Sequence, residues 1–171
     1  SSTPTVVATS GNGSTLITQA LQGSSTASSV TFPSGVLPST YTMFHVTRYT
    51  GGTNARIIQG VTQNWLSGFW GGYSGVAYHN GWLTQSATSV HGNNWVISTD
   101  QNSLYRSNGV NRTTASPGSP SYDHIGINSG GYGTTEASTF QIAELVVYNS
   151  TLTSTQITTV EGWLDYKYGI F

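Results

Sequence analysis

Residues 140–170 read FQIAELVVYNSTLTSTQITTVEGWLDYKYGI, and this stretch carries the clearest signals of secondary structure in the sequence. Residues 139–148, which overlap its first part, have the residue pattern of a strand that ends at polar turn residues. Thr153 and Gln156 then form a capping box, and Gly169 stands where a left-handed C-cap is expected. Between them, apolar residues recur on one helical stripe: Ile157, Val160, Leu164 and Tyr168. The stretch predicts a strand followed by one helix of about 14 residues.

Upstream of this stretch, short alternating segments are separated by Gly, Asn, Ser and Pro. This pattern is typical of antiparallel strands joined by turns. Gly51-Gly52 and Asn108-Gly109 are hairpin signals, because these residues accept the positive φ angles of a tight turn. Besides residues 139–148, strands are predicted at 41–49, 54–61, 75–83, 94–99, 103–107 and 124–128.

These elements predict an all-β fold, a two-sheet antiparallel jelly-roll sandwich with one short C-terminal helix. Many short strands without alternating helices bury their apolar faces best against each other. The chain has 171 residues, about the size of one domain, and shows no long internal repeat. We expect a single domain over residues 1–171, with residues 1–5 approximately as a linker remnant of a larger protein.

The composition excludes several classes of function. With five Lys and Arg, six Asp and Glu, and a net charge of −1, the chain cannot build the basic surface that nucleic acid requires. No apolar run approaches the ~20 residues of a membrane-spanning helix, so no membrane insertion is expected. The absence of Cys excludes thiolate nucleophiles and disulfides. Five Trp, ten Tyr and five Phe argue against disorder.

The C-terminal stretch, together with HIGIN at residues 124–128, resembles the closing segment of the concanavalin A-like lectin and glucanase superfamily, in its laminin-G-like branch. TYTMFHVTRYT and WVISTDQNSLYRSNG resemble the inner hairpins of that superfamily. The resemblance implies a jelly roll that binds glycans or proteins, often with calcium, or that cleaves polysaccharides. The chain also resembles a terminal module of a chlorella-virus virion protein, which implies an extracellular, virion or cell-surface location. Function itself must come from sites.

The acidic residues disfavour a glycoside hydrolase. Hydrolysis needs two carboxyl groups that face each other across the glycosidic bond. No strand face carries two of the six acids, which are Asp100, Asp123, Glu136, Glu144, Glu161 and Asp165. Glu144 is the acid nearest a plausible site, and we interpret it as a structural carboxylate.

Polysaccharide β-elimination needs other residues: a cation or amide that neutralises a uronate carboxylate, and a Tyr or His that moves the C5 proton. A two-residue turn at Gly51-Gly52 would pair residue 49 with 54, 47 with 56 and 45 with 58. One face of that hairpin is then predicted to display His45, Thr47, Tyr49, Asn54 and Arg56.

In this lyase hypothesis Arg56, assisted by Asn54, holds the uronate carboxylate. Tyr49 or His45 removes the proton and returns one to the leaving oxygen. The alternative is a solvated sheet face on which Arg56 and Tyr49 pair across strands for modest stability.

Four further residues complete the predicted site. His79 and Tyr78 replace the acid and base if the hairpin register is shifted by one residue. Arg48 and Gln59 fall on the opposite, inner face, and a one-residue bulge would turn them toward substrate.

Aromatic residues give the next signal, since residues 64–83 read NWLSGFWGGYSGVAYHNGWL. Flat rings stack on the apolar faces of sugars, and amides bond the hydroxyl groups. We expect exposure in a groove or loop for at least one of Trp70, Tyr73 and Tyr78. Core positions are the ordinary expectation for the other large rings: Trp65, Trp82 and Trp95.

No cofactor is required by this chemistry, but calcium is compatible with one turn. Asp100 and Asn102 between two strands, or Asp123 before HIGIN, offer oxygen ligands. An Asx turn explains Asp100 and Asn102 without any ion.

The sequence therefore predicts a carbohydrate-active domain that binds and cleaves a cell-surface or cell-wall polysaccharide by β-elimination at uronic acids. Two alternatives remain open, a non-catalytic lectin-like module and a laminin-G-like protein-interaction module.

Overall fold

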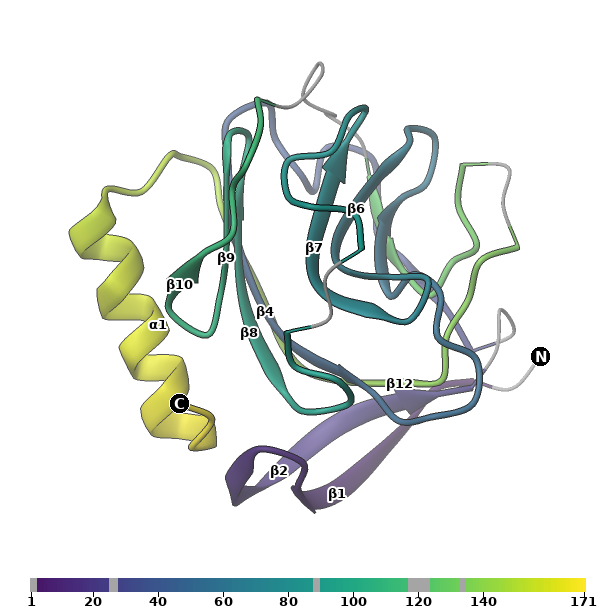
Figure 1. Ribbon diagram of the computed structural model, residues 1–171. Coiled ribbons are helices and arrows are strands. Elements are labelled where there is room, and N and C mark those ends of the chain that lie inside the picture. Colours follow the sequence, from purple (N-terminus) through teal and green to yellow (C-terminus); the bar gives the residue numbers. More distant parts are fainter. Residues whose placement is uncertain (1–2, 25–27, 88–89, 117–123, 133–134) are drawn as a thin grey trace.

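The computed structural model describes residues 3–24, 28–87, 90–116, 124–132 and 135–171, and these form two antiparallel sheets and one C-terminal helix (Figure 1). The predicted all-β sandwich with a closing helix is confirmed. Within the described residues, no helix is long and apolar enough to cross a membrane.

The two sheets differ in size. The larger has seven strands, in the order β1 (Thr5–Gly11), β2 (Ser14–Gly23), β12 (Phe140–Tyr148), β4 (Thr42–Tyr49), β8 (Val96–Gln101), β9 (Leu104–Ser107) and β10 (Val110–Asn111). The smaller has five, in the order β3 (Val30–Thr31), β11 (Ile125–Ile127), β5 (Ile58–Gly60), β6 (Trp65–Trp70) and β7 (Tyr73–His79).

The Gly51-Gly52 hairpin is a wrong prediction. Both glycines have positive φ, 94° and 73°, but the turn carries the chain from one sheet to the other. β4 pairs with β12 and β8 in the larger sheet, while β5 pairs with β6 and β11 in the smaller one. Thr139 fixes this crossing, since its carbonyl accepts from Thr50 and its amide donates to Thr53. β12, almost a hundred residues later in the chain, pairs with β4 where the predicted hairpin would have placed β5.

The Asn108-Gly109 hairpin is confirmed. Asn108 and Gly109 have φ values of 45° and 73°, and Ser107 pairs with Val110 across them. Both central residues therefore lie in the positive-φ region that a type I′ turn requires.

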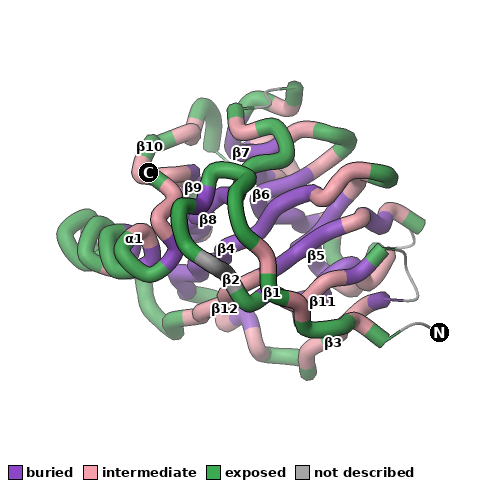
Figure 2. The backbone as a smooth tube through the Cα atoms, turned by 90° about the horizontal axis from the view of Figure 1, so that it is seen from below, coloured by how far each residue is buried: buried purple, intermediate pink, exposed green. Residues whose placement is uncertain are grey.

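The main core lies between the sheets, and Figure 2 shows buried segments running through the middle of both. Every residue of β4 is buried. Its Met43 and Tyr49 pack toward the smaller sheet, whereas Phe44 and Val46 pack on the opposite face, beneath the helix. A central strand covered on both sides has no solvated face.

Helix α1 (Ser154–Tyr168) closes the fold as the sequence predicts. Thr153 and Gln156 form the capping box, and Gly169 ends the helix at φ 62°. The apolar stripe packs on the outer face of the larger sheet through Ile157, Leu164 and Tyr168.

Candidate functional site

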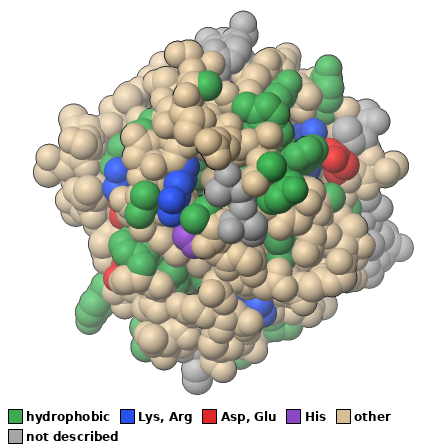
Figure 3. All heavy atoms as spheres, in the orientation of Figure 1, with side chains coloured by type: hydrophobic (Ala, Val, Ile, Leu, Met, Phe, Trp, Pro, Cys, Tyr) green, Lys and Arg blue, Asp and Glu red, His purple; other side chains and the backbone are tan. Residues whose placement is uncertain are grey.

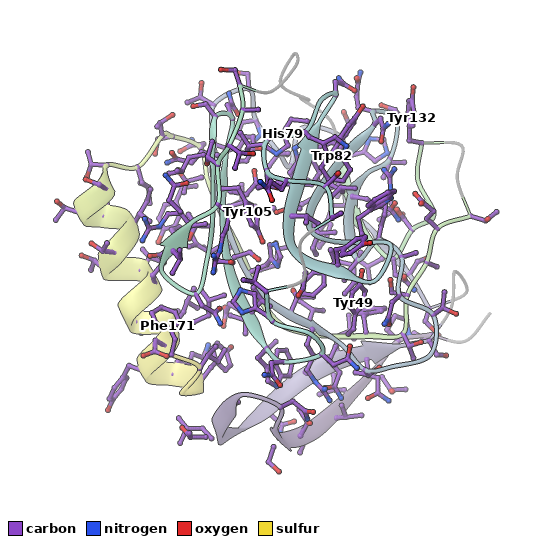
Figure 4. All side chains as sticks on the ribbon, in the orientation of Figure 1. Tyr49, His79, Trp82, Tyr105, Tyr132 and Phe171 are labelled. Atoms are coloured by element: carbon purple, nitrogen blue, oxygen red, sulfur yellow. The ribbon has the colours of Figure 1, made fainter. Side chains whose placement is uncertain are left out.

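A depression of about 220 Å³ opens on the smaller sheet, at strands β6 and β7. Three aromatic side chains and three others line it: Trp70, Tyr78, Trp82, Arg56, Asn64 and Leu66. Figure 4 shows Trp82 beside these strands, on the side of the molecule away from Phe171 and the helix.

Strand alternation places the aromatic lining. Along β6, Trp65 and Phe69 enter the core between the sheets, so Leu66 and Trp70 face outward. Across the ladder Leu66 pairs with Tyr78, and Trp70 pairs with Tyr73 next to the turn. The outward side chains of β6 and β7 thereby meet on one surface.

Trp82 arrives from the segment after β7, which turns back along the edge of the smaller sheet. Trp82 bridges Tyr78, and Leu83 donates to the carbonyl of Ala77. The Trp82 ring meets Trp70 and Tyr78 edge to face, with centroids 5.2 Å apart in each case, and Tyr73 stacks on Trp70 at 6.4 Å. All four rings are half-buried, so each keeps part of its surface in solvent.

A carboxylate fixes the polar side of the depression. Glu136 forms an ion pair with Arg56 Nε at 2.5 Å and accepts a hydrogen bond from Trp70 Nε1 at 3.3 Å. Arg56 Nη1 donates to Asn64 Oδ1 at 2.9 Å. Arg56 and Glu136 cancel each other's charge, so the floor of the depression is polar and neutral.

Some of the residues that the sequence analysis names lie at this depression. Among them, Arg56, Trp70 and Tyr78 line the depression, and Tyr73 stacks on its rim. Trp82 was predicted to lie in the core, and that prediction is wrong.

Other residues of the site had a weaker signal. The sequence analysis did not name Asn64 or Glu136. Glu136 lies 66 residues from Trp70, whose indole donates a hydrogen bond to it, so no local pattern connects the two. The core positions predicted for Trp65 and Trp95 are confirmed. For the position of Trp82, the sequence signal was the Asn80-Gly81 pair before it, because this pair turns the chain back over β7.

The predicted polar face of the hairpin lies inside the molecule. His45 has no exposure, and its ring nitrogens lie 2.9 Å from Thr47 Oγ1 and 3.2 Å from Ser67 Oγ. Burial lowers the pKa of His45 to about 4. Tyr49 is equally buried, donates its hydroxyl to the Ala55 carbonyl, and has a pKa raised by burial.

The shared face of His45, Tyr49, Asn54 and Arg56 is therefore a wrong prediction, and its cause is the missing hairpin. Asn54 is half-buried in the connection between the sheets. Arg56 alone of these four lines the depression.

His79 and Tyr78 are neighbours in sequence with opposite surroundings. Tyr78 faces the depression, whereas His79 is buried, stacked on Trp65, and within 3.2 Å of Asp100. Burial opposes protonation of His79, but the Asp100 carboxylate outweighs it and raises the pKa. Tyr41 donates to the same carboxylate at 2.8 Å.

The two residues expected to turn toward substrate stay inside. Arg48 is buried, donates to Gln141 at 2.7 Å and lies over the Trp95 ring. Gln59 has no exposure and pairs with Leu66 in the ladder. No bulge redirects either side chain.

The turn predicted to suit calcium is occupied by hydrogen bonds. Asp100 is buried between Tyr41 and His79, and Asn102 donates to the Ser39 carbonyl. Asp123 lies outside the described residues. Among those described, no three His, Cys, Asp or Glu side chains cluster as metal ligands.

Glu144 has the structural role that the sequence suggests. It accepts from Lys167 Nζ at 2.5 Å and from the Tyr168 hydroxyl at 2.6 Å, which ties β12 to the helix. Partial burial alone would raise the pKa of Glu144, but these two donors lower it.

Comparison with known proteins supports the architecture. The chain matches no protein-family model and no curated protein. Among solved structures it is similar to domain 4 of AbnA, a GH43 extracellular arabinanase from Geobacillus stearothermophilus, in complex with arabinotriose. The TM-score is 0.63 at 14% identity, over 92% of this chain and 81% of that domain.

It is also similar to Trypanosoma rangeli sialidase. The complex with 2,3-difluorosialic acid gives a TM-score of 0.58 at 12% identity, over 94% of this chain and 32% of the sialidase. The complex with the inhibitor DANA gives 0.54 at 14% identity. This chain spans about a third of the sialidase length.

These similarities establish a β-sandwich fold that occurs in carbohydrate-active proteins. They do not confirm the concanavalin A-like jelly roll, and they give no support to the virion resemblance.

Proposed function

We propose that this domain is a non-catalytic glycan-binding module that holds neutral sugar units in the depression lined by Trp70, Tyr78 and Trp82. The carrying observation is the outward aromatic cluster over a charge-balanced Arg56–Glu136 floor. We infer that it works as one module of a larger extracellular or surface protein.

The chemistry of the lining suits a sugar. Aromatic faces pack on sugar C–H groups, and Arg56, Asn64 and Glu136 offer donors and acceptors to hydroxyl groups. A uronate would bring an uncompensated negative charge next to Glu136, so a neutral sugar fits this depression better. The arabinanase domain whose structure holds arabinotriose supports a glycan partner through its fold.

Elimination chemistry loses its structural basis here. The hypothesis required Arg56 to neutralise a uronate beside an accessible Tyr or His. Glu136 already pairs with Arg56, and His45, Tyr49 and the substitute His79 are buried. Tyr78 alone of the named acid and base candidates lines the depression. Among the described acids, Glu136 alone contacts the lining of the depression, so the pair needed for hydrolysis is not assembled there either.

A glycan panel tests the proposal. The wild type, Trp70→Ala, Trp82→Ala and the control Trp163→Ala are measured against arabinan, galactan, xylan, mannan, β-glucan and polygalacturonate oligosaccharides. Trp163 is half exposed on the helix, away from the depression, and so reports nonspecific effects of losing an indole.

We expect binding to at least one neutral oligosaccharide, weakened about tenfold or more in the two depression variants because stacking rings dominate such sites. The control should bind like the wild type. Binding to none of the panel, or equal binding by all variants, would overturn the proposal in favour of the protein-interaction alternative.

A further inference from the structure

A second depression, of about 230 Å³, lies next to the first and differs from it in chemistry. The segment that follows β7 lines both depressions: Trp82 lines the first, and Thr84 and Gln85 line the second. The lining of the second is almost entirely polar: Gly75, Thr84, Gln85, Asn111, Arg112, Thr113 and Thr114.

Arg112 is the basic residue of this second depression. Its Nε donates to Ser107 Oγ at 3.0 Å. An arginine has four more N–H donors on its two terminal nitrogens, and within the described residues these have no partner. The guanidinium is therefore anchored at one end and open at the other.

The other cations of the chain are already satisfied within the described structure. Arg56, Arg106 and Lys167 form ion pairs with Glu136, Glu161 and Glu144 respectively. Arg48 is buried over Trp95 and bonds amide and carbonyl oxygens. Arg112 is the cation that has no anionic partner in the described part of the chain.

A partly buried hydrogen-bond network holds the Arg112 anchor in place. Ser107 has no exposure, and its Oγ lies 2.9 Å from His91 Nε2. Asn108 Oδ1 accepts from the Ile97 amide, so its Nδ2 donates to His91 Nδ1. His91 Nδ1 is then an acceptor and Nε2 carries the proton, which it donates to Ser107.

Among the described residues, no acidic side chain contacts His91. Its described neighbours are Ser74, Ser107, Asn108 and the Arg112 charge, and Figure 3 shows a basic side chain beside a histidine on this face, over the region between β7 and β9. Burial and the Arg112 charge lower the pKa of His91 to about 4. The pKa of His91 should therefore change when an anion binds to Arg112 or when the Arg112 charge is removed.

We propose that this second depression binds an oxyanion carried by a sugar, a uronate carboxylate or a sulfate ester, through the open end of Arg112. A planar guanidinium matches either group with two parallel hydrogen bonds. The exposed Asn111 and Thr114 at the rim provide contacts for neighbouring hydroxyl groups.

This proposal rests on the proposed function only in taking the ligand to be a sugar. It adds an acidic subsite beside the neutral aromatic one. Trp82 and Thr84 are two residues apart, so the two depressions share one segment of the chain. One glycan with neutral and acidic units could occupy both.

The test is a titration followed by NMR, with trigalacturonate, its fully methyl-esterified counterpart and galactose 6-sulfate as probes. The wild type, Arg112→Gln and Arg112→Lys are compared. The His91 imidazole signals report the second depression, and the Trp70 and Trp82 indole signals report the first.

We expect trigalacturonate to shift His91 and to bind about tenfold or more tightly than its ester, because a charge-assisted pair is lost on esterification. Arg112→Gln should remove this preference, and Arg112→Lys should keep part of it. A sulfate response alone would identify the sulfate ester as the ligand group. In the unliganded Arg112→Gln protein the His91 pKa should rise, which confirms the contact.

Equal binding of acid and ester, or a preference that survives Arg112→Gln, would overturn the acidic subsite. A His91 response to trigalacturonate without any indole response would retain it, and the aromatic site would then be judged by the neutral sugars of the glycan panel.

Discussion

Gly68 of β6 lies close to the buried His45 ring of β4, at a point where the smaller sheet approaches the larger one. It has φ 89°, and a Cβ atom there would lie 2.7 Å from His45 Cε1. Gly51 has a similar φ of 94° with nothing within 4 Å of such an atom. At both positions the positive φ would strain an alanine, but only at Gly68 would the added Cβ atom also collide with a neighbouring side chain.

Gly68→Ala and Gly51→Ala therefore form a matched pair. Each should lose about 1–2 kcal/mol for the left-handed conformation. Gly68→Ala should lose about 1–3 kcal/mol more, because the buried imidazole cannot move away. Urea unfolding measures both values, and equal losses would contradict the close contact between β6 and His45.

At the scale of elements, a buried ion pair fastens helix α1 to the larger sheet. Glu161 is 2% exposed and accepts from Arg106 Nε and Nη2 at 2.9 Å each, and from Thr99 Oγ1 at 2.7 Å. The helix thereby contacts both β8 and β9 through one carboxylate.

Removal of either partner should have unequal effects. Arg106→Met leaves a buried carboxylate unpaired and should cost about 3 kcal/mol. Glu161→Met should cost less, since the Arg106 side chain is 20% exposed and can reach water. The double variant should fall short of the sum of the singles by at least about 1 kcal/mol. A double-mutant cycle from unfolding curves checks this, and strict additivity would refute the coupling.

Local patterns predicted these elements where local interactions decide them. The capping box at Thr153 and the Asn108-Gly109 turn needed only neighbouring residues, and both are confirmed. β1 and β2 were not predicted, because their Ser- and Thr-containing segments lack a clear apolar alternation. One of the two partners of β4 is β12, and no local signal specifies a pairing across almost a hundred residues.

The same reason limits what could be predicted of the site. The aromatic run of residues 64–83 is a local signal, and the expectation that at least one of Trp70, Tyr73 and Tyr78 reaches a groove is met by Trp70 and Tyr78. The Arg56–Glu136 pair joins residues 80 apart in sequence, and only the folded sheet brings them together.

At the scale of the whole molecule, buried histidines couple stability to pH. His45 takes up a proton near pH 6.5 when unfolded, but only near pH 4 when folded. The stability that this neutral imidazole contributes is full above pH 6.5 and is lost as the pH falls toward 4. The loss amounts to about 3 kcal/mol. His91, with its pKa also lowered to about 4, acts in the same direction.

His79 acts in the opposite direction. Its pKa is raised in the folded state, so its contribution is full below pH 6.5 and is lost as the pH rises through the folded value. Unfolding free energies between pH 4 and 7 should thus fall on acidification, and His45→Gln should flatten the fall. An unchanged slope in that variant would contradict neutral burial of His45.

The central claim is that a glycan occupies the aromatic depression on β6 and β7. The chain has five Trp residues, so its indole N–H signals form a small, assignable set. In a titration with the neutral oligosaccharide that binds best, the signals of Trp70 and Trp82 should shift together, while those of the buried Trp65 and Trp95 and of Trp163 on the helix stay in place. Shifts confined to Trp163, or binding that moves none of the five, would contradict the account.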